Sequence, residues 1–324
     1  MDWRVKSLAF RALSRVPYGD ELHYFAQRYL LGSFPRPRKR LDALWEKARQ
    51  FVDAFSTYGP GTPLANVRFL EIGAGRDLSV PIALRLQGVG RVDAVDISRL
   101  AKLDLVGHSA AHMAARATVP PIRVDSWDDV EAFGVMYHAP ANLGSFAEAS
   151  IDCVCSNEVL EHLDPEHLRE TADATRRLLR PGGISVHTID YSDHYARSDT
   201  RIDRFNFLTF DDRAWRKHDS AFQYVNRLRH SDYVRMFESS GLRLLSATVT
   251  QGRPTTTARS GIAERFARYS DADLFALGGR IILGNRVEDL PASKTFLDSR
   301  TGGLHNHMRS PREHSTLPAS LPCK

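Results

Sequence analysis

The sequence predicts an α/β fold in which helices cover both faces of a parallel sheet. Short, almost continuously apolar segments alternate with longer segments of helical periodicity. The first apolar segment ends in Gly73-Ala74-Gly75, a turn that can deliver a strand to a helix. Two further apolar segments late in the chain bring the expected strands to seven. Strands of a parallel sheet are buried on both faces, so they lack the polar alternation of a half-exposed strand.

Length and composition allow one large folded unit in the 324 residues. With 42% hydrophobic and 26% charged residues, the chain as a whole is not of the disordered class. The sequence lacks the run of 18 or more apolar residues that a membrane-spanning helix requires. Three cysteines are too few for a disulfide framework, so we expect a reducing, cytoplasmic location.

The net charge of +5 lies at the two ends of the chain. Residues 1–60 carry eleven Lys and Arg against six Asp and Glu, and residues 285–324 carry six against four. Residues 61–284 carry 27 against 29 and are slightly acidic. A nucleic-acid reader usually presents a basic stripe on its folded body. We therefore do not expect nucleic acid as a partner.

Residues 1–62 are predicted to form an N-terminal helical segment. Residues 1–19 mix four Lys and Arg with apolar side chains but contain no hydrophobic region typical of a secretory signal. They could contact a membrane surface peripherally, and we favour a helix packed on the domain. The basic residues of 36–40, interrupted by prolines, predict a solvated linker. Apolar residues at steps of three and four between Leu41 and Phe55 predict the next helix.

Residues 63–284 are predicted to form the main domain. Its first five strands are expected at residues 67–72, 92–97, 122–124, 151–155 and 184–189. Helices are expected at residues 78–86, 98–116 and 165–180, the last closed by Pro181-Gly182-Gly183.

After residue 190 the alternation stops for about forty residues. Long irregular inserts in compact domains are often functional, so we expect residues 190–230 to form a lid over the acceptor substrate. A helix near 231–240 and strands at 242–249 and 275–283 complete the domain. Residues 285–324, with four prolines and many polar residues, are predicted to be a disordered tail.

The glycine turn and Asp96 together indicate a nucleoside site at one edge of the sheet. Glycines let backbone N–H groups approach a ligand closely, and Asp96, at the end of the second strand, can accept hydrogen bonds from both ribose hydroxyls. The alternative to a nucleoside site is that these segments are tight turns that bind no ligand. Asp77 would repel a pyrophosphate, and Glu71 adds a second carboxylate. Both favour a cofactor with cationic groups over a nicotinamide dinucleotide.

On these residues the chain resembles the class I S-adenosylmethionine-dependent methyltransferases. The departure is at Asp77, where many members have a third glycine. Five segments are similar to the family's motifs in the expected order: Leu70-Glu71-Ile72-Gly73-Ala74-Gly75, Ala94-Val95-Asp96-Ile97-Ser98, Arg123-Val124-Asp125-Ser126-Trp127, residues 151–163, and Leu178-Leu179-Arg180-Pro181-Gly182-Gly183. The resemblance implies a Rossmann-like, doubly wound, seven-stranded sheet, mostly parallel with an antiparallel C-terminal strand. It also implies S-adenosyl-L-methionine as cofactor and a small-molecule or glycan acceptor, with O-methylation favoured.

The resemblance also implies which residues contact the cofactor. They are Glu71, Gly73, Ala74 and Gly75 around the methionine moiety, Asp96 and Ile97 at the ribose, Asp125 and Ser126 at the adenine, and Asn157 and Val159 beneath the sulfonium. Asp96 and Asp125 could instead be helix N-caps.

Glu158, Glu161 and His162 would share one face of a helix. Some relatives use a Glu-x-x-Glu-His arrangement for a divalent cation, but we favour a helix face without metal. If the acceptor is a hydroxyl, His162, His194 or Asp193 could receive its proton.

Three other functions remain open at this point. A nicotinamide-dependent oxidoreductase could use the same sheet, and a catalytically silent domain could bind the cofactor without transferring a group. An RNA methyltransferase is suggested by the Glu-x-x-Glu-His segment and the basic ends, although the acidic body argues against it.

Overall fold

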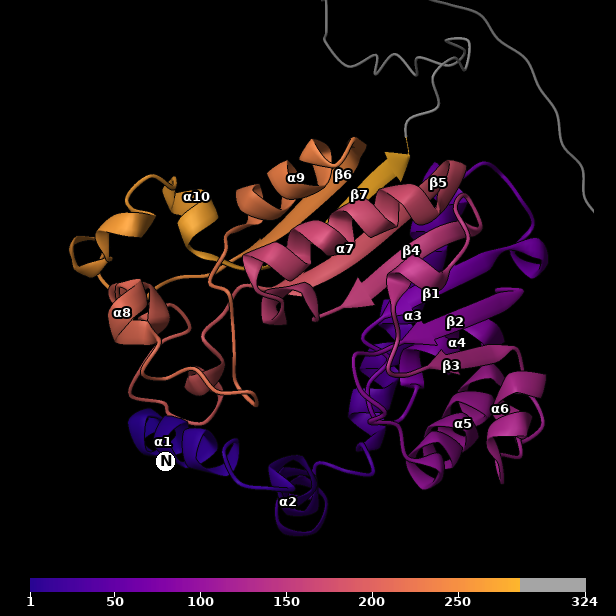
Figure 1. Ribbon diagram of the computed structural model, residues 1–324, viewed down its shortest axis with the longest axis horizontal. Coiled ribbons are helices and arrows are strands. Elements are labelled where there is room, and N and C mark those ends of the chain that lie inside the picture. The colour runs from indigo at the N-terminus through magenta and orange to yellow at the C-terminus, as the bar shows by residue number, and fades with distance from the viewer. Residues whose placement is uncertain (286–324) are drawn as a thin grey trace, which may run out of the picture. The chain divides into compact units, whose positions relative to one another are not determined.

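The computed structural model describes residues 1–285 of the chain (Figure 1). Seven strands form one sheet in the order β3-β2-β1-β4-β5-β7-β6. Strands β1 to β5 pair in parallel, whereas β7 runs antiparallel to its neighbours β5 and β6. The expected mostly parallel, Rossmann-like sheet with an antiparallel C-terminal strand is confirmed. The strands are β1 Arg68–Ile72, β2 Arg91–Val95, β3 Val135–His138, β4 Ile151–Asn157, β5 Leu179–Asp190, β6 Leu242–Gln251 and β7 Ala276–Asn285.

The predicted tail begins one residue too early, because Asn285 is the last residue of β7. The rest of that prediction, residues 286–324, lies outside the described residues. The α-helices of the described part are α1 Trp3–Leu13, α2 Gly19–Phe25, α3 Arg38–Tyr58, α4 Ser79–Leu86, α5 Leu103–Ala117, α6 Trp127–Ala132, α7 Pro165–Leu178, α8 Asp212–Trp215, α9 His230–Ser239 and α10 Asp271–Leu274.

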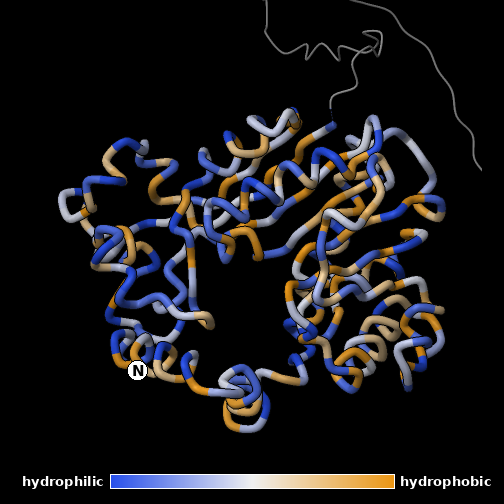
Figure 2. The backbone as a smooth tube through the Cα atoms, in the orientation of Figure 1, coloured by the Kyte–Doolittle hydropathy of each residue, from blue (hydrophilic) through white to orange (hydrophobic). Residues whose placement is uncertain are grey.

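Helices cover both faces of the sheet. On one face, α3, α4 and α5 pack against the central strands, and on the other face α7 and α9 do so. Successive strand residues point to opposite faces, so Phe69 joins the first cluster and Leu70 the second. This two-sided burial explains the continuously apolar strands of the sequence. The helices, which have one solvent face, carry both hydrophobic and hydrophilic residues (Figure 2).

The third strand is not at residues 122–124, and that prediction is wrong. Pro120 and Pro121 precede the segment, and proline cannot donate a ladder hydrogen bond, so the segment stays outside the sheet. The chain instead forms α6, turns at Gly134 with φ +92°, and enters β3 beside β2. The third strand therefore begins at Val135 and not at residue 122, and α6 before it was not predicted.

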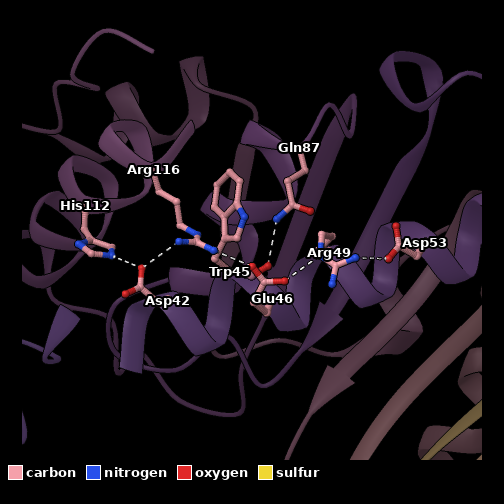
Figure 3. A network of polar contacts seen from close by, with 8 residues as sticks. All are labelled: Asp42, Trp45, Glu46, Arg49, Asp53, Gln87, His112 and Arg116. Atoms are coloured by element: carbon pink, nitrogen blue, oxygen red, sulfur yellow. Dashed lines mark hydrogen bonds and ion pairs between the residues drawn. The ribbon is translucent and has the colours of Figure 1, made fainter. Parts of the chain in front are cut away.

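Polar contacts on the outer surface of α3 hold this helix against α5 (Figure 3). Arg116 donates to Glu46 at 2.6 Å and reaches Asp42 at 3.5 Å. His112 Nε2 lies 3.0 Å from the same Asp42 carboxylate. Each exposed pair contributes only about 0.2–1 kcal/mol, so most of the attachment comes from the buried apolar face of α3. The result fixes where the first turn of α3 lies relative to β1 and β4.

Residues 190–230 are not a plain irregular loop. Together with residues 262–275 and α1, they form a separate aromatic cluster. Trp3 is 1% exposed, and its ring centroid lies 5.6 Å from Tyr195 and 6.0 Å from Trp215. Figure 1 shows α1 beside this part of the chain. The N-terminal helix therefore packs on the domain, while Val5 and Leu8 on its other side stay exposed. Among the described residues, no helix is long and apolar enough to cross a membrane.

Candidate active site

The turn after β1 brings peptide groups to the edge of the sheet. Gly73 and Gly75 have φ angles of +83° and +69°, a region that favours glycine. A Cβ on Gly73 would lie 2.4 Å from Cγ2 of Val159, so a larger residue does not fit there. The N–H groups of Gly73 and Ala74 donate to the carbonyl of Val95 at 2.8 and 3.1 Å, which ties the turn to β2.

Asp96 follows β2 at the same edge. Its carboxylate accepts hydrogen bonds from the N–H of Gly75 at 3.1 Å and from the N–H of Ile97 at 2.8 Å. Burial raises the pKa of Asp96, and these hydrogen bonds oppose the shift. Asp96 is not a helix cap, because α5 begins only at Leu103. Ile97 exposes 81% of its surface.

A cavity of about 210 Å³, here called the inner cavity, lies between the glycine turn and the end of β4. Glu71 lines it, is 2% exposed, and its Oε2 has no hydrogen-bond partner among the described residues. Burial, followed by the charges of Asp96 and Asp77, raises the pKa of Glu71 well above its usual value. An unpartnered buried carboxyl group is costly, and a cation in the inner cavity would offset that cost.

Two arginines of the segment predicted to be a solvated linker also line the inner cavity. The segment is largely exposed, as predicted, but residues 38–40 form the first turn of α3 and not a linker. Arg36 Nε lies 2.7 Å from the carboxylate of Asp77, which is 3% exposed. Arg40, in the first turn of α3, lies 3.4 Å from Glu158. Asp77 is therefore paired with a cation, and its charge alone does not argue against a phosphate-bearing ligand.

A second cavity of about 650 Å³, here called the apolar cavity, adjoins the other side of the glycine turn. Its walls come from the ends of β1 and β2, the loop after β3, and the start of α7. The residues that matter for a nucleoside are Asp96, Ile97, Leu100, Ala141, Asn142, Leu143, Gly144 and Leu163. The cavity is large enough to hold a nucleoside next to the carboxylate of Asp96.

Asp125 and Ser126 do not line this cavity, which corrects their expected place at the adenine. Asp125 is exposed and pairs with Arg123. Ser126 is the N-cap of α6 and accepts a hydrogen bond from the N–H of Asp129 at 3.2 Å. Both residues were expected to follow a third strand at 122–124, and they lose that position because the strand forms further along the chain.

Glu158 borders three cavities: the inner cavity, the apolar cavity and a third of about 580 Å³ beside β5, β6 and β7, here called the cationic cavity. Its φ of +55° is unusual for a residue with a side chain, and such strain is common at functional sites. Its N–H donates to the carbonyl of Thr188 at 2.8 Å. Asn157 lines the inner cavity, and Val159 lines both the inner cavity and the apolar cavity. This corner is where the cavities meet.

The expected helix at residues 158–162 is instead a single 3₁₀ turn, Leu160–His162. Glu158 is consequently separate from Glu161 and His162. These two approach His194, from the segment after β5, and one potential ligand atom from each of the three lies within 4.8 Å of the others. Buried atoms Oε2 of Glu161 and Nε2 of His194 have no hydrogen-bond partner among the described residues.

The two histidines have different surroundings. His162 Nδ1 lies 2.7 Å from the carbonyl of Tyr224, and desolvation lowers the pKa of His162. His194 Nε2 lies 3.4 Å from the carboxylate of Asp190. Burial alone would raise the pKa of Asp190, but the nearby His194 ring and the hydrogen bond from the N–H of Ser192 hold it below its usual value. Asp190 is therefore a carboxylate that can orient His194.

Asp193 does not lie in the site, in contrast to its expected role as a proton acceptor. It is fully buried, caps the short helix His194–Arg197, and accepts hydrogen bonds from Tyr195 N at 2.8 Å and Asn206 Nδ2 at 3.0 Å. Burial raises the pKa of Asp193, and these hydrogen bonds oppose the shift. Its contacts hold residues 190–230 together.

Several site residues were absent from the sequence prediction. The loop Ala141–Gly144 was missed because the third strand was placed too early; the apolar run after Gly134 was the available signal. Arg36 and Arg40 were missed because nothing in their local pattern shows that the chain returns over the glycine turn. Asp190 was named only as part of the lid.

Residues 24–247 match the family described as a methyltransferase domain. No protein of the curated set matches the chain. Among solved structures, a geranyl diphosphate C-methyltransferase from Streptomyces coelicolor A3(2) is 14% identical, with a TM-score of 0.44 over 74% of this chain and 78% of that one. The N-methyltransferase NodS from Bradyrhizobium japonicum WM9 is 15% identical, with a TM-score of 0.39 over 77% and 97% of the two chains. At such low likeness, the family assignment rests on the match over residues 24–247.

Proposed function

The chain belongs to the methyltransferase-domain family, within the class I S-adenosylmethionine-dependent superfamily, and we propose that it transfers a methyl group to the oxygen of a small-molecule acceptor. The observation that carries this proposal is the buried, unpartnered carboxyl group of Glu71 at the inner cavity. S-Adenosylmethionine bears an ammonium group and a sulfonium, and either cation would complement that carboxylate. A glycan is the alternative acceptor for the same reaction.

The residues at the inner cavity and the apolar cavity fit this cofactor in a definite order. Glu71 and the glycine turn would hold its amino-acid end in the inner cavity, and Asp96 would hold the ribose hydroxyls. Ile97 and Leu143 would cover the adenine in the apolar cavity. When bound, the cofactor supplies the electrophilic methyl group. The chain then has to place the acceptor in line with that methyl group, and positioning alone can lower a barrier by about 7–11 kcal/mol.

His162 and His194 are the proposed receivers of the acceptor proton. Their ring centroids lie 5.2 Å apart, and His162 lines the apolar cavity together with Glu158. Because desolvation lowers the pKa of His162, its ring is neutral at pH 7 and free to accept a proton. Asp190 would orient His194 and stabilise its charged form. Glu158 and Asn157 would shape the floor between cofactor and acceptor.

Transfer of a labelled methyl group tests the proposal against its rivals. We expect label from S-adenosylmethionine to appear in at least one member of a panel of hydroxyl, amine and carboxyl compounds. An oxidoreductase would instead bind NADH and oxidise it, and a silent binding domain would bind the cofactor without any transfer. An RNA acceptor would give activity that falls steeply with salt, and the slightly acidic body argues against such an acceptor.

A divalent cation is a second candidate role for Glu161, His162 and His194. The two unpartnered buried atoms of this group favour it, since carboxylate and imidazole are suitable ligands. Treatment with EDTA separates the two roles. Activity that survives EDTA supports proton transfer to the histidines, and activity that is lost and then restored by Mg²⁺ or Mn²⁺ assigns the group to a metal.

A cytoplasmic location is part of the same proposal. Cys153 and Cys155 are free, buried thiols in β4, which suits a reducing compartment. Burial raises the pKa of both thiols well above the usual value, so neither is an activated nucleophile.

A further inference from the structure

The cationic cavity has a polar floor that the pairing of three strands builds. In the sheet, Thr188 of β5 pairs with Arg280 of β7, and Arg280 in turn pairs with Thr248 of β6. Two residues earlier in β7, Gly278 pairs with Asp190 of β5 on one side and with Thr250 of β6 on the other. Paired residues of neighbouring strands point to the same face, so these side chains form one surface. Gly278 carries no side chain, which leaves space above the floor.

Three basic side chains from different elements line this cavity: Lys47 of α3, Arg204 of the segment after β5, and Arg280 of β7. Within the described residues, none of the three has a carboxylate partner. The two acidic residues of the lining are already engaged, since Glu158 lies 3.4 Å from Arg40 and Asp190 pairs with Arg197 and His194. The cavity therefore has an excess of uncompensated positive charge.

The position of this cavity connects the charge to the reaction. Glu158 lines it together with the inner and apolar cavities, and Asp190, the partner of His194, lies on its floor. A molecule of about acceptor size fits in its 580 Å³, and Asp190 connects its lining to His194. The binding energy for such a molecule has to come from the groups that line the walls.

We infer that the methyl acceptor carries an anionic group, a carboxylate or a phosphate, held by Lys47, Arg204 and Arg280. This inference rests on the proposed methyl transfer and names the class of its acceptor. The planar guanidinium of Arg280 can give two parallel hydrogen bonds to such a group, and Lys47 adds a point charge. The hydroxyls of Thr248 and Thr250 complete a polar site for the anion. A neutral acceptor would leave three cations unused beside it.

Pyrophosphate binding tests the inference without knowledge of the acceptor. Protein saturated with S-adenosylhomocysteine is titrated with inorganic pyrophosphate by calorimetry at low ionic strength. We expect one saturable site, weakened roughly tenfold or more in Lys47→Gln and in Arg280→Gln, since each loses a charged hydrogen-bond donor. The matched control is Arg243→Gln, an exposed arginine of β6 outside the cavity lining, which should bind pyrophosphate as the unchanged protein does.

Matched acceptor pairs give the second readout. Hydroxy acids and phosphorylated alcohols are compared with their neutral amides and unphosphorylated forms in the labelled transfer assay. The expected result is activity on the anionic member of a pair, with a higher KM in Arg280→Gln. Preferential methylation of neutral members, or equal pyrophosphate binding in all variants, overturns the inference. If S-adenosylhomocysteine itself fails to bind, the proposed function fails instead, so the two failures are distinguishable.

Discussion

Single residues at the edge of the sheet combine structural and ligand-binding constraints. Gly73 must lack a side chain because Val159 occupies the space, and its φ is positive. Asp96 holds the turn through Gly75 and still lies on the wall of the apolar cavity. Glu71 has no such structural partner for its Oε2, which is why it points to a ligand rather than to stability.

Replacement of Asp96 by alanine is expected to remove cofactor binding and leave the fold intact. Hydrogen bonds to a charged group contribute about 1.5–3 kcal/mol each, so loss of both ribose contacts weakens binding at least about a hundredfold. Calorimetry with S-adenosylhomocysteine measures the affinity, and circular dichroism checks the fold. Asp125→Ala is the matched control and should keep full affinity, because Asp125 lies outside the cavity. Normal affinity in Asp96→Ala would remove the assignment of the ribose site.

The acidic limb of the pH profile is assigned to His162. Desolvation lowers the pKa of His162 below 6.5, so the neutral ring persists at lower pH than for a free histidine. We expect kcat/KM to hold at pH 7 and to fall only at a pH below the usual histidine value of 6.5. His162→Gln should reduce kcat about a hundredfold and abolish this limb, while S-adenosylhomocysteine affinity stays normal. His108→Gln, on the exposed side of α5, is the control. An unchanged pH profile of kcat/KM in His162→Gln would exclude proton transfer to His162.

At the scale of elements, α1 belongs with residues 190–230. The ring of Trp3 packs among Tyr195, Trp215 and His218, and the backbone N–H of Trp3 donates to the carboxylate of Asp199 at 2.9 Å. Residues 190–230 in turn bind β7 and the loop before it. This arrangement gives the expected lid its own core.

Trp3→Ala should release α1 before it unfolds the sheet. A buried tryptophan truncated to alanine costs about 3–5 kcal/mol of packing, and here that loss falls on the aromatic cluster. We expect early proteolytic cleavage within residues 1–30 and a lower melting temperature. Leu8→Ala, at an exposed position of the same helix, should have little effect. Equal protease resistance in the two variants would contradict this account of α1.

Asp203 fastens the segment after β5 to the loop before α10, and its contribution depends on pH. Its carboxylate accepts hydrogen bonds from the N–H groups of Thr255, Thr256 and Thr257 at 2.8–2.9 Å. Burial alone would raise the pKa of Asp203, but the bonds from Thr257 and its neighbours lower it to about 2. A lowered folded-state pKa gives stability that is complete above the unfolded value of 3.8 and is lost as the pH falls through 3.8 toward 2.

The difference in unfolding free energy between Asp203→Asn and the unchanged protein should therefore be largest at pH 7 and should shrink by pH 3. Urea unfolding at pH 7, 5 and 3 measures it. Asp173→Asn, at an exposed position of α7, should show no such trend. A pH-independent difference for Asp203→Asn would mean that its charge does not matter.

The elements show where pattern reasoning works and where it stops. Strands β1, β2, β4 and β5 were predictable because burial on both faces leaves an apolar run and a glycine or polar turn marks each end. The third strand was misplaced because a short apolar run after two prolines looks like a strand but cannot pair as one. The 3₁₀ turn at Leu160–His162 was misread as a helix because spacing alone does not distinguish one turn from several.

At the scale of the whole molecule, the meeting of the glycine turn with Asp96 was predictable, whereas the places of Asp125 and Ser126 and the grouping of distant side chains were not. The glycine turn and Asp96 meet because parallel strands end at one edge of a sheet, a consequence of topology. The grouping of Glu161, His162 and His194, and of Lys47 with Arg280, depends on how distant segments fold back. No local spacing records such contacts.

Calorimetric titration of the purified protein with S-adenosylhomocysteine tests the central claim most directly. Acidic groups at the ends of β1 and β2 are claimed to hold a nucleoside that bears a cationic amino-acid group. The predicted result is saturable binding of one S-adenosylhomocysteine per chain, lost in Asp96→Ala and weakened in Glu71→Gln. The absence of saturable binding, or tighter binding of NADH than of S-adenosylhomocysteine, would contradict the claim.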